Sequence, residues 1–148
     1  MKTIETRIEI DATPDQVWAA LTDTARFPEW NPFIRELSGE LAVGSRLDVR
    51  IQPPGAKGMR FRPTVRAFEP HRELRWLGTV GVRGLFDGEH RFGLEPLPHG
   101  RTLFTHAETF RGLLVPFTSG MLANTQAGFE AMNRALRDRV AASVTVTG

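Results

Sequence analysis

Hydrophobic and polar residues alternate with a period of two along most of the chain. Near the N-terminus, Ile4, Ile8 and Ile10 alternate with charged residues, which predicts a half-buried first strand. Six later segments are separated by turns rich in glycine and proline, and we expect a strand in each: residues 34–40, 45–52, 59–68, 73–80, 85–95 and 101–110. Short strands at this spacing predict a meandering antiparallel sheet of seven strands.

Three segments have helical spacing instead. Thr13 is a good N-cap residue and Pro14 suits the first helical position, so a short helix is expected to follow the first strand. A second short helix is expected over residues 24–29, because Pro32 disfavours helical geometry just beyond it. Near the C-terminus a stripe recurs at steps of three, four or seven residues and predicts an amphipathic helix over residues 113–142: Leu122, Thr125, Phe129, Met132, Leu136 and Val140.

The order of these elements predicts an α+β fold. A seven-stranded antiparallel sheet must cover one of its faces, and the long C-terminal helix offers the apolar stripe that can do so. A strongly curved sheet around one helix cannot close tightly at both ends, so we expect an internal, mostly apolar cavity between them. The 148 residues fit a single domain, residues 1–148.

Composition and charge exclude several classes of function. The chain has no cysteine, which rules out disulfides, thiol nucleophiles and thiolate metal sites. The formal net charge is only +2, and Arg60, Arg62 and Arg66 alternate with other residues as on a solvated sheet face, so we expect no nucleic-acid partner. The N-terminus lacks the apolar region of a signal peptide, and no stretch approaches about 18 apolar residues. We therefore expect a cytoplasmic protein without stable membrane insertion.

The last predicted hairpin carries the candidate chemistry. On its two strands, His90, His106 and Glu108 share the face of several phenylalanines, so this face is expected to look inward. If the turn is Leu97-Pro98-His99 with Gly100 in the left-handed position, Leu94 pairs with Thr102. His90 then lies opposite His106, and Gly88 lies opposite Glu108. A slip of one residue would separate the two faces, so this register is a hypothesis.

These three polar residues allow several roles. A neutral histidine can act as a general base near neutral pH, and Glu108 could orient it. Such groups would suit enolisation or dehydration of a poly-keto chain, but His90, His106 and Glu108 could equally orient a ligand or bond only one another. Two histidines and a carboxylate are also a possible iron or zinc triad. Adjacent strand positions are a weak signal for a metal, and we expect none.

The predicted cavity wall combines inward-facing strand residues with the apolar stripe of the long helix. Phenylalanine and methionine provide adaptable apolar surface there. Core residues and cavity-lining residues have the same composition, so these side chains could also simply fill the space. The expected lining residues are Ile10, Phe61, Val65, Trp76, His90, Phe92, Phe104, His106, Glu108, Leu122, Phe129 and Met132.

Short motifs along nearly the whole chain resemble one superfamily. They lie at residues 12–18, 21–23, 27–32, 44–45, 70–76, 88–92, 100–102 and 110–112. With them the chain resembles the START-related SRPBCC superfamily, in its polyketide cyclase/dehydrase-like branch. The resemblance implies a helix-grip fold, no metal and no cofactor. It does not fix an activity, because this superfamily includes carriers, receptors, cyclases and protein-binding domains.

Three functions remain open. The preferred one is binding, transport or sensing of a small hydrophobic molecule such as a lipid, polyketide, quinone or aromatic metabolite. The second is a cofactor-free cyclase or dehydratase that uses His90, His106 and Glu108. The third is a protein-interaction domain of the co-chaperone type, which would have a filled interior and an exposed apolar patch. The sequence does not determine the oligomeric state.

Overall fold

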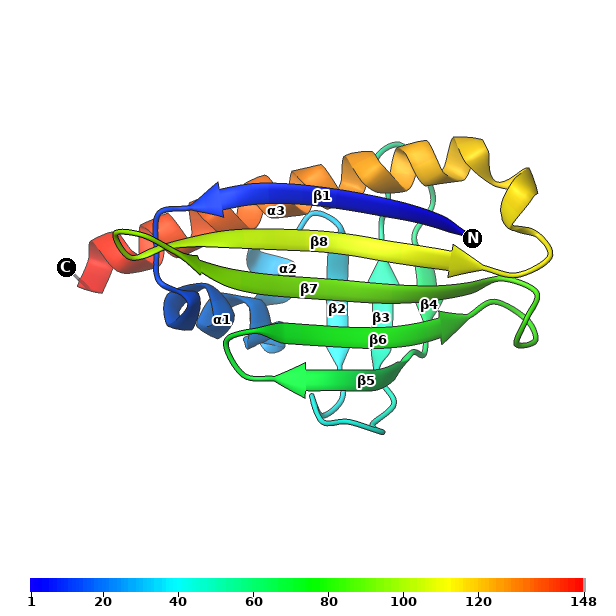
Figure 1. Ribbon diagram of the computed structural model, residues 1–148, viewed down its shortest axis with the longest axis horizontal. Helices are drawn as coiled ribbons and strands as arrows, with labels where there is room; N and C mark the ends of the chain where they lie inside the picture. Colours follow the sequence, from blue (N-terminus) through cyan, green and yellow to red (C-terminus); the bar gives the residue numbers. More distant parts are fainter. Residues whose placement is uncertain (148) are drawn as a thin grey trace.

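The chain begins with a strand and ends with a long helix, and the computed structural model describes residues 1–147 (Figure 1). Short 3₁₀ turns, η1 and η2, precede α2 and α3. The elements are β1 (Lys2–Ile10), α1 (Pro14–Thr22), η1 (Thr24–Arg26), α2 (Phe27–Trp30), β2 (Ile34–Ser38), β3 (Asp48–Ile51), β4 (Met59–Phe61), β5 (Thr64–Glu69), β6 (Glu73–Thr79), β7 (Asp87–Leu97), β8 (Arg101–Arg111), η2 (Val115–Phe117) and α3 (Ser119–Thr147).

The strands form two antiparallel sheets. The larger sheet has the order β1-β8-β7-β6-β5, and the smaller one has the order β2-β3-β4. In Figure 1 the strands of the smaller sheet run crosswise behind β6 and β7. An isolated bridge between Arg46 and Thr64 links the chain before β3 to the start of β5. The two sheets therefore curve round a common interior.

The helix-grip arrangement is confirmed, but one expected strand is divided. Residues 59–68 were predicted as a single strand, whereas β4 and β5 belong to different sheets. Pro63 stands between them and has no backbone N–H to continue a ladder. Its carbonyl accepts a hydrogen bond from the amide of Leu47 at 2.8 Å, which holds the corner against the segment before β3. The described chain thus has eight strands where the sequence predicted seven.

Thr13 is the N-cap of α1, as the sequence predicted, and it forms a capping box with Gln16. The Thr13 hydroxyl accepts a hydrogen bond from the Gln16 amide, and the Gln16 side chain accepts one from the Thr13 amide. The second expected helix is shorter, because residues 24–26 form the 3₁₀ turn η1 and only Phe27–Trp30 are α-helical. These short helices close one end of the grip.

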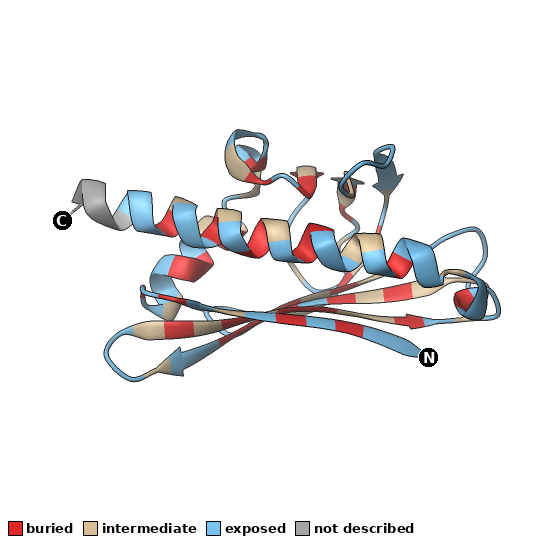
Figure 2. Cartoon of the chain, turned by 90° about the horizontal axis from the view of Figure 1, so that it is seen from above, coloured by how far each residue is buried: buried red, intermediate tan, exposed pale blue. Residues whose placement is uncertain are grey.

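The long helix α3 covers the inner side of the larger sheet, with its buried stripe turned inward (Figure 2). It begins at Ser119 instead of residue 113. The preceding segment, from the left-handed Gly112 through η2, packs on the β6–β7 loop, where the Leu113 amide donates to the Gly84 carbonyl. Both α3 and the smaller sheet lie on the same side of the larger sheet.

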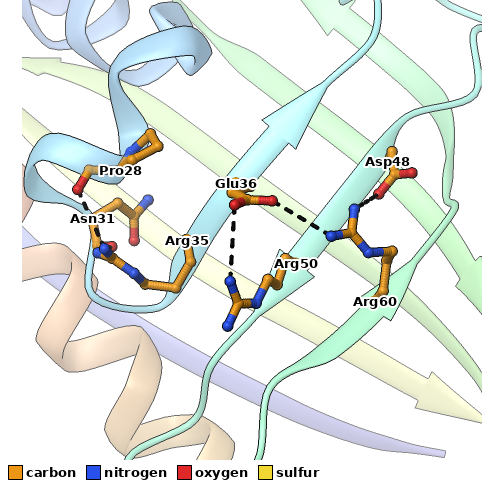
Figure 3. A network of polar contacts seen from close by, with 7 residues as sticks. All are labelled: Pro28, Asn31, Arg35, Glu36, Asp48, Arg50 and Arg60. Atoms are coloured by element: carbon orange, nitrogen blue, oxygen red, sulfur yellow. Dashed lines mark hydrogen bonds and ion pairs between the residues drawn. The ribbon is translucent and has the colours of Figure 1, made fainter.

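Charged side chains lie on the outer face of the smaller sheet and form ion pairs there (Figure 3). Glu36 lies 3.5 Å from Arg60, which also contacts Asp48 at 2.7 Å. Arg35 donates a hydrogen bond to the Asn31 carbonyl at 2.5 Å and so ties β2 to the end of α2. Exposed ion pairs of this kind contribute little stability. They do, however, pair the guanidinium group of Arg60 with carboxylates of the protein itself.

Candidate functional site

The register of β7 and β8 places the polar residues of the site. His90 lies opposite Glu108 and Phe92 opposite His106, so the predicted pairing of His90 with His106 is wrong by two residues. The strands continue to Leu97 and Arg101, and the turn between them has two left-handed residues, His99 and Gly100. The predicted turn over residues 97–99 therefore lies one residue too early, and the left-handed conformation was expected only at Gly100, because it is uncommon at a histidine. An even shift keeps the same residues on the inner face.

A buried hydrogen-bond chain begins on β1. The Thr6 hydroxyl donates to the His106 carbonyl at 2.9 Å, and it accepts from the Asn133 amide nitrogen at 2.8 Å. This arrangement turns the Asn133 oxygen toward Nδ1 of His106, 2.9 Å away. Because an amide oxygen can only accept, His106 carries its proton on Nδ1.

Burial lowers the pKa of His106 well below the usual value for histidine. The charge of His90 lowers it further, against the opposing effect of the hydrogen bond to Asn133. His106 is therefore neutral near neutral pH, and its Nε2 offers a lone pair. Nε2 of His90 lies 2.7 Å from this atom and must donate its proton to it.

The chain ends at Glu108. When His90 donates from Nε2 and is neutral, its Nδ1 is left with a lone pair, and this buried atom has no hydrogen-bond partner among the described residues. The nearest acidic oxygen is Oε1 of Glu108, 3.6 Å away. The His90 side chain is 1% exposed and that of Glu108 is 17% exposed. A base and a carboxyl group are thus held side by side at an apolar wall.

Gly88 makes room for this carboxyl group. A Cβ placed on Gly88 would collide with Oε2 of Glu108 and lie 3.3 Å from its Cδ. The sequence singled out Gly88 only by its place in the register, so its function as a gap for Glu108 comes from the structure.

The wall formed by His90 and Glu108 belongs to a cavity of about 280 Å³. It lies between the larger sheet, the smaller sheet and the start of α3. Apart from His90, Glu108 and two threonines, the lining residues are apolar, glycine or proline. Four lining residues are 41–43% exposed, so the cavity reaches the surface beside them: Met59, Val80, Leu114 and Met121.

Of the twelve expected lining residues, the structure places four on the cavity wall: Phe61, Trp76, His90 and Glu108. Trp76 lies beside His90, with ring centroids 5.1 Å apart. The other eight are buried in the packed core: Ile10, Val65, Phe92, Phe104, His106, Leu122, Phe129 and Met132.

Aromatic packing fills the space beside His106 and the phenylalanines of this group. The ring of Phe129 stacks on His106 at 3.9 Å, and Phe33 packs edge-on against Phe129 at 5.4 Å. Phe92 closes against His106 at 4.7 Å. These rings fill the part of the grip nearest the short helices and leave the cavity in the remaining part.

The sequence missed lining residues from the smaller sheet, from the loops and from the first turn of α3: Phe33, Val49, Ile51, Phe86, Leu114 and Met121. No local pattern signals that β2 and β3 cross over the inner face, because this depends on the division of the strands into two sheets. Phe110 also lines the cavity, and its alternation with Glu108 on β8 was a usable signal.

Residues 1–147, the part of the chain that the structure describes, offer neither a metal site nor a membrane-spanning helix. In that part of the chain, no group of three histidine, aspartate or glutamate residues is arranged to hold a metal ion. None of the helices described there is both long and apolar enough to cross a bilayer.

Solved structures with the same fold cover nearly the whole chain. The ZhuI aromatase/cyclase from Streptomyces sp. R1128 is 13% identical, with a TM-score of 0.80 over 99% of this chain and 98% of that one. A START superfamily protein from Mycobacterium smegmatis is 24% identical, with a TM-score of 0.70 over 94% and 97%. Norcoclaurine synthase from Thalictrum flavum, in complex with dopamine and hydroxybenzaldehyde, is 15% identical, with a TM-score of 0.71 over 95% and 86%. At these identities the likeness shows the fold alone.

Sequence comparison identifies the family. No curated protein matches the chain significantly. The model of the family described as polyketide cyclase / dehydrase and lipid transport matches residues 1–141. This match covers most of the chain and agrees with the helix-grip fold, so the chain belongs to the polyketide cyclase/dehydrase and lipid transport family.

Proposed function

We propose that this chain binds a small, mostly hydrophobic molecule in its cavity. The observation that carries the proposal is the apolar cavity of about 280 Å³ with one polar corner at His90 and Glu108. Small-molecule sites are typically apolar concavities of about 300–1,000 Å³ with a few convergent polar groups. At about 280 Å³ the cavity is slightly smaller than this range, and it is apolar with convergent polar groups.

A filled interior was expected of a protein-interaction domain. The cavity therefore weighs against that alternative, and the family description, which includes lipid transport, supports a small apolar ligand. Lipids, polyketides, quinones and aromatic metabolites all satisfy the apolar wall.

The test introduces a larger side chain into the cavity, at a glycine whose Cβ position has free space around it. A Cβ added at Gly78 would meet only Pro63, at 3.8 Å, so Gly78→Leu can direct its side chain into the cavity. Gly120→Leu is the matched control, because nothing lies within 4 Å of its added Cβ and it does not line the cavity. Native mass spectrometry of the purified protein would identify a retained molecule, and titration with the neutral dye Nile red would measure cavity binding.

The wild type and Gly120→Leu should bind the dye saturably at one molecule per chain. Gly78→Leu should bind it at least tenfold more weakly, since a leucine side chain occupies the space of several ligand atoms. Absence of saturable binding by the wild type, or equal binding by both variants, would contradict the proposal.

A second candidate function is acid–base catalysis on a ligand that carries ketone groups. The observation that favours it is the unpartnered, buried Nδ1 of His90 beside Glu108 at the cavity wall. This lone pair can take a proton from a carbon between two carbonyls, and the resulting carbanion adds to a second ketone of the same chain, whose oxygen takes that proton and becomes a hydroxyl. A second proton taken from the same carbon, with one donated by protonated Glu108 to the hydroxyl, then releases water and leaves a carbon–carbon double bond. Transfer of the proton from His90 back to Glu108 restores both groups. Such a cyclisation and dehydration needs no redox cofactor. The solved aromatase/cyclase with the same fold makes a poly-keto chain a reasonable substrate to try.

Glu108→Gln separates catalysis from binding. Glutamine has nearly the same shape and keeps a hydrogen-bonding group beside His90, but it cannot transfer a proton. An enzyme should lose most of its turnover of a poly-keto substrate, roughly a hundredfold or more, while dye affinity stays within about twofold. Unchanged turnover would contradict the catalytic function of Glu108 and leave ligand binding intact.

A further inference from the structure

A second concave site lies directly outside the cavity. This outer cleft has a volume of about 460 Å³ and is bordered by β4, the ends of β5 and β6, and the β6–β7 loop. Three residues line both the outer cleft and the cavity: Met59, Phe61 and Val80. Met59 is 43% exposed and Val80 is 41% exposed, so only partly packed side chains separate the two spaces.

The outer cleft is strongly basic. Five arginines line it and none of its lining residues is acidic: Arg46, Arg60, Arg62, Arg66 and Arg83. This is a local excess of positive charge on a chain whose formal net charge is only +2. A concave site lined by one sign of charge attracts ions of the opposite sign.

The five arginines differ in how far the protein itself satisfies them. Arg60 is held by Asp48 and Glu36 (Figure 3), and Arg62 lies 4.0 Å from Asp48. Within residues 1–147, the side chains of Arg66 and Arg83 have neither an ion pair nor a hydrogen bond. At least two guanidinium groups are therefore free to bind an anion.

We propose that the ligand of the cavity is amphipathic, with an anionic carboxylate or phosphate group bound by the arginines of the outer cleft and an apolar body inside the cavity. The inference rests on the proposed binding function and narrows the ligand class. Guanidinium groups bind carboxylates and phosphates through paired, charge-assisted hydrogen bonds. Met59, Phe61 and Val80 form the boundary that the apolar body crosses.

The experiment compares ligands that share a tail and differ in the head group. Decan-1-ol, decanoate and decyl phosphate are titrated by calorimetry at low and at high salt, and inorganic phosphate tests the head group alone. The variant is Arg66→Gln/Arg83→Gln, which removes two charges without breaking an internal contact. The matched control is Arg72→Gln/Arg134→Gln, which removes two exposed arginines that line neither the cleft nor the cavity.

The proposal expects both anionic ligands to bind roughly tenfold more tightly than decanol at low salt, as several exposed ion pairs together allow. High salt and the Arg66→Gln/Arg83→Gln variant should each remove most of this advantage and leave decanol binding unchanged. The control variant should keep it. A preference for decanoate alone or for decyl phosphate alone would identify the head group.

Three results would overturn the inference. Equal affinity for all three tailed ligands would refute the anion site while supporting the apolar cavity. An equal loss of affinity for the anionic ligands in the control variant would assign the effect to net charge alone. If inorganic phosphate bound as tightly as decyl phosphate, the anion would bind in the cleft without any contribution from the cavity. If none of the tailed ligands binds, the proposed function itself fails.

Discussion

Acid should destabilise this protein through one histidine. His106 is fully buried, and its surroundings lower its pKa well below the ordinary value. In the unfolded chain it regains a pKa of about 6.5. Between these two values the unfolded state binds one proton more than the folded state, so the free energy of unfolding falls as the pH falls through this window.

The magnitude follows from the proton linkage. One extra proton in the unfolded state changes the free energy of unfolding by about 1.4 kcal/mol per pH unit. The loss accumulated between pH 8 and pH 5 therefore has an upper bound of about 2 kcal/mol, which applies when the folded histidine stays neutral over this whole range. The glutamine of His106→Gln does not titrate in this range. The variant therefore loses the stability contributed by the contacts of the ring at every pH, but its free energy of unfolding lacks the further decrease in acid that His106 causes.

Urea unfolding at a series of pH values measures the effect. The destabilisation caused by His106→Gln should be largest at pH 8 and smaller at pH 5, by up to about 2 kcal/mol. Carboxylates that titrate in both proteins cancel in this difference. His99→Asn is the control, because His99 is exposed and asparagine tolerates its positive φ of 66°. A penalty for His106→Gln that stays constant with pH within about 0.5 kcal/mol would refute the lowered pKa of His106 in the folded protein.

Three further substitutions test the packing around the site. Gly128→Ala should destabilise the protein by about 1–3 kcal/mol, because the new Cβ would lie 2.6 Å from Cε1 of Phe33, whereas Gly120→Ala, with open space, should stabilise it by about 0.5 kcal/mol. Urea denaturation of both decides, and a shift of the same sign in the two would contradict the close approach. Asn133→Leu should cost about 2 kcal/mol in the same assay, because it leaves the buried Nδ1–H of His106 without an acceptor; a cost below about 0.5 kcal/mol would show that water replaces the amide.

Most of the fold could be predicted from local sequence patterns. The Thr13–Gln16 capping box, the alternation along β8 and the stripe of α3 are each set by neighbours in sequence, and each is present in the structure. The inner face of the last hairpin also followed from alternation alone. His90, His106 and Glu108 lie together there because a two-residue error in register does not change which face a residue occupies.

The boundaries of the cavity depended on contacts between distant segments. Phe33 lies far from Phe129 in sequence, yet their rings meet and fill one half of the grip. The smaller sheet closes over the other half, and Pro63 marks the corner between its last strand and β5. Alternation tells which side of a strand faces inward, but it does not tell whether another side chain or open space lies beyond it.

His90 stands at the boundary between the filled and the open halves of the interior. Its ring centroid lies 5.0 Å from that of Phe129 on the core side and 5.1 Å from that of Trp76 on the cavity side. Because its Nε2 is committed to His106, only Nδ1 remains for a ligand or for Glu108. Any chemistry at this wall is therefore limited to one lone pair and one carboxyl group. The same restriction means that a ligand which donates a hydrogen bond to Nδ1 completes the buried chain that begins at Thr6.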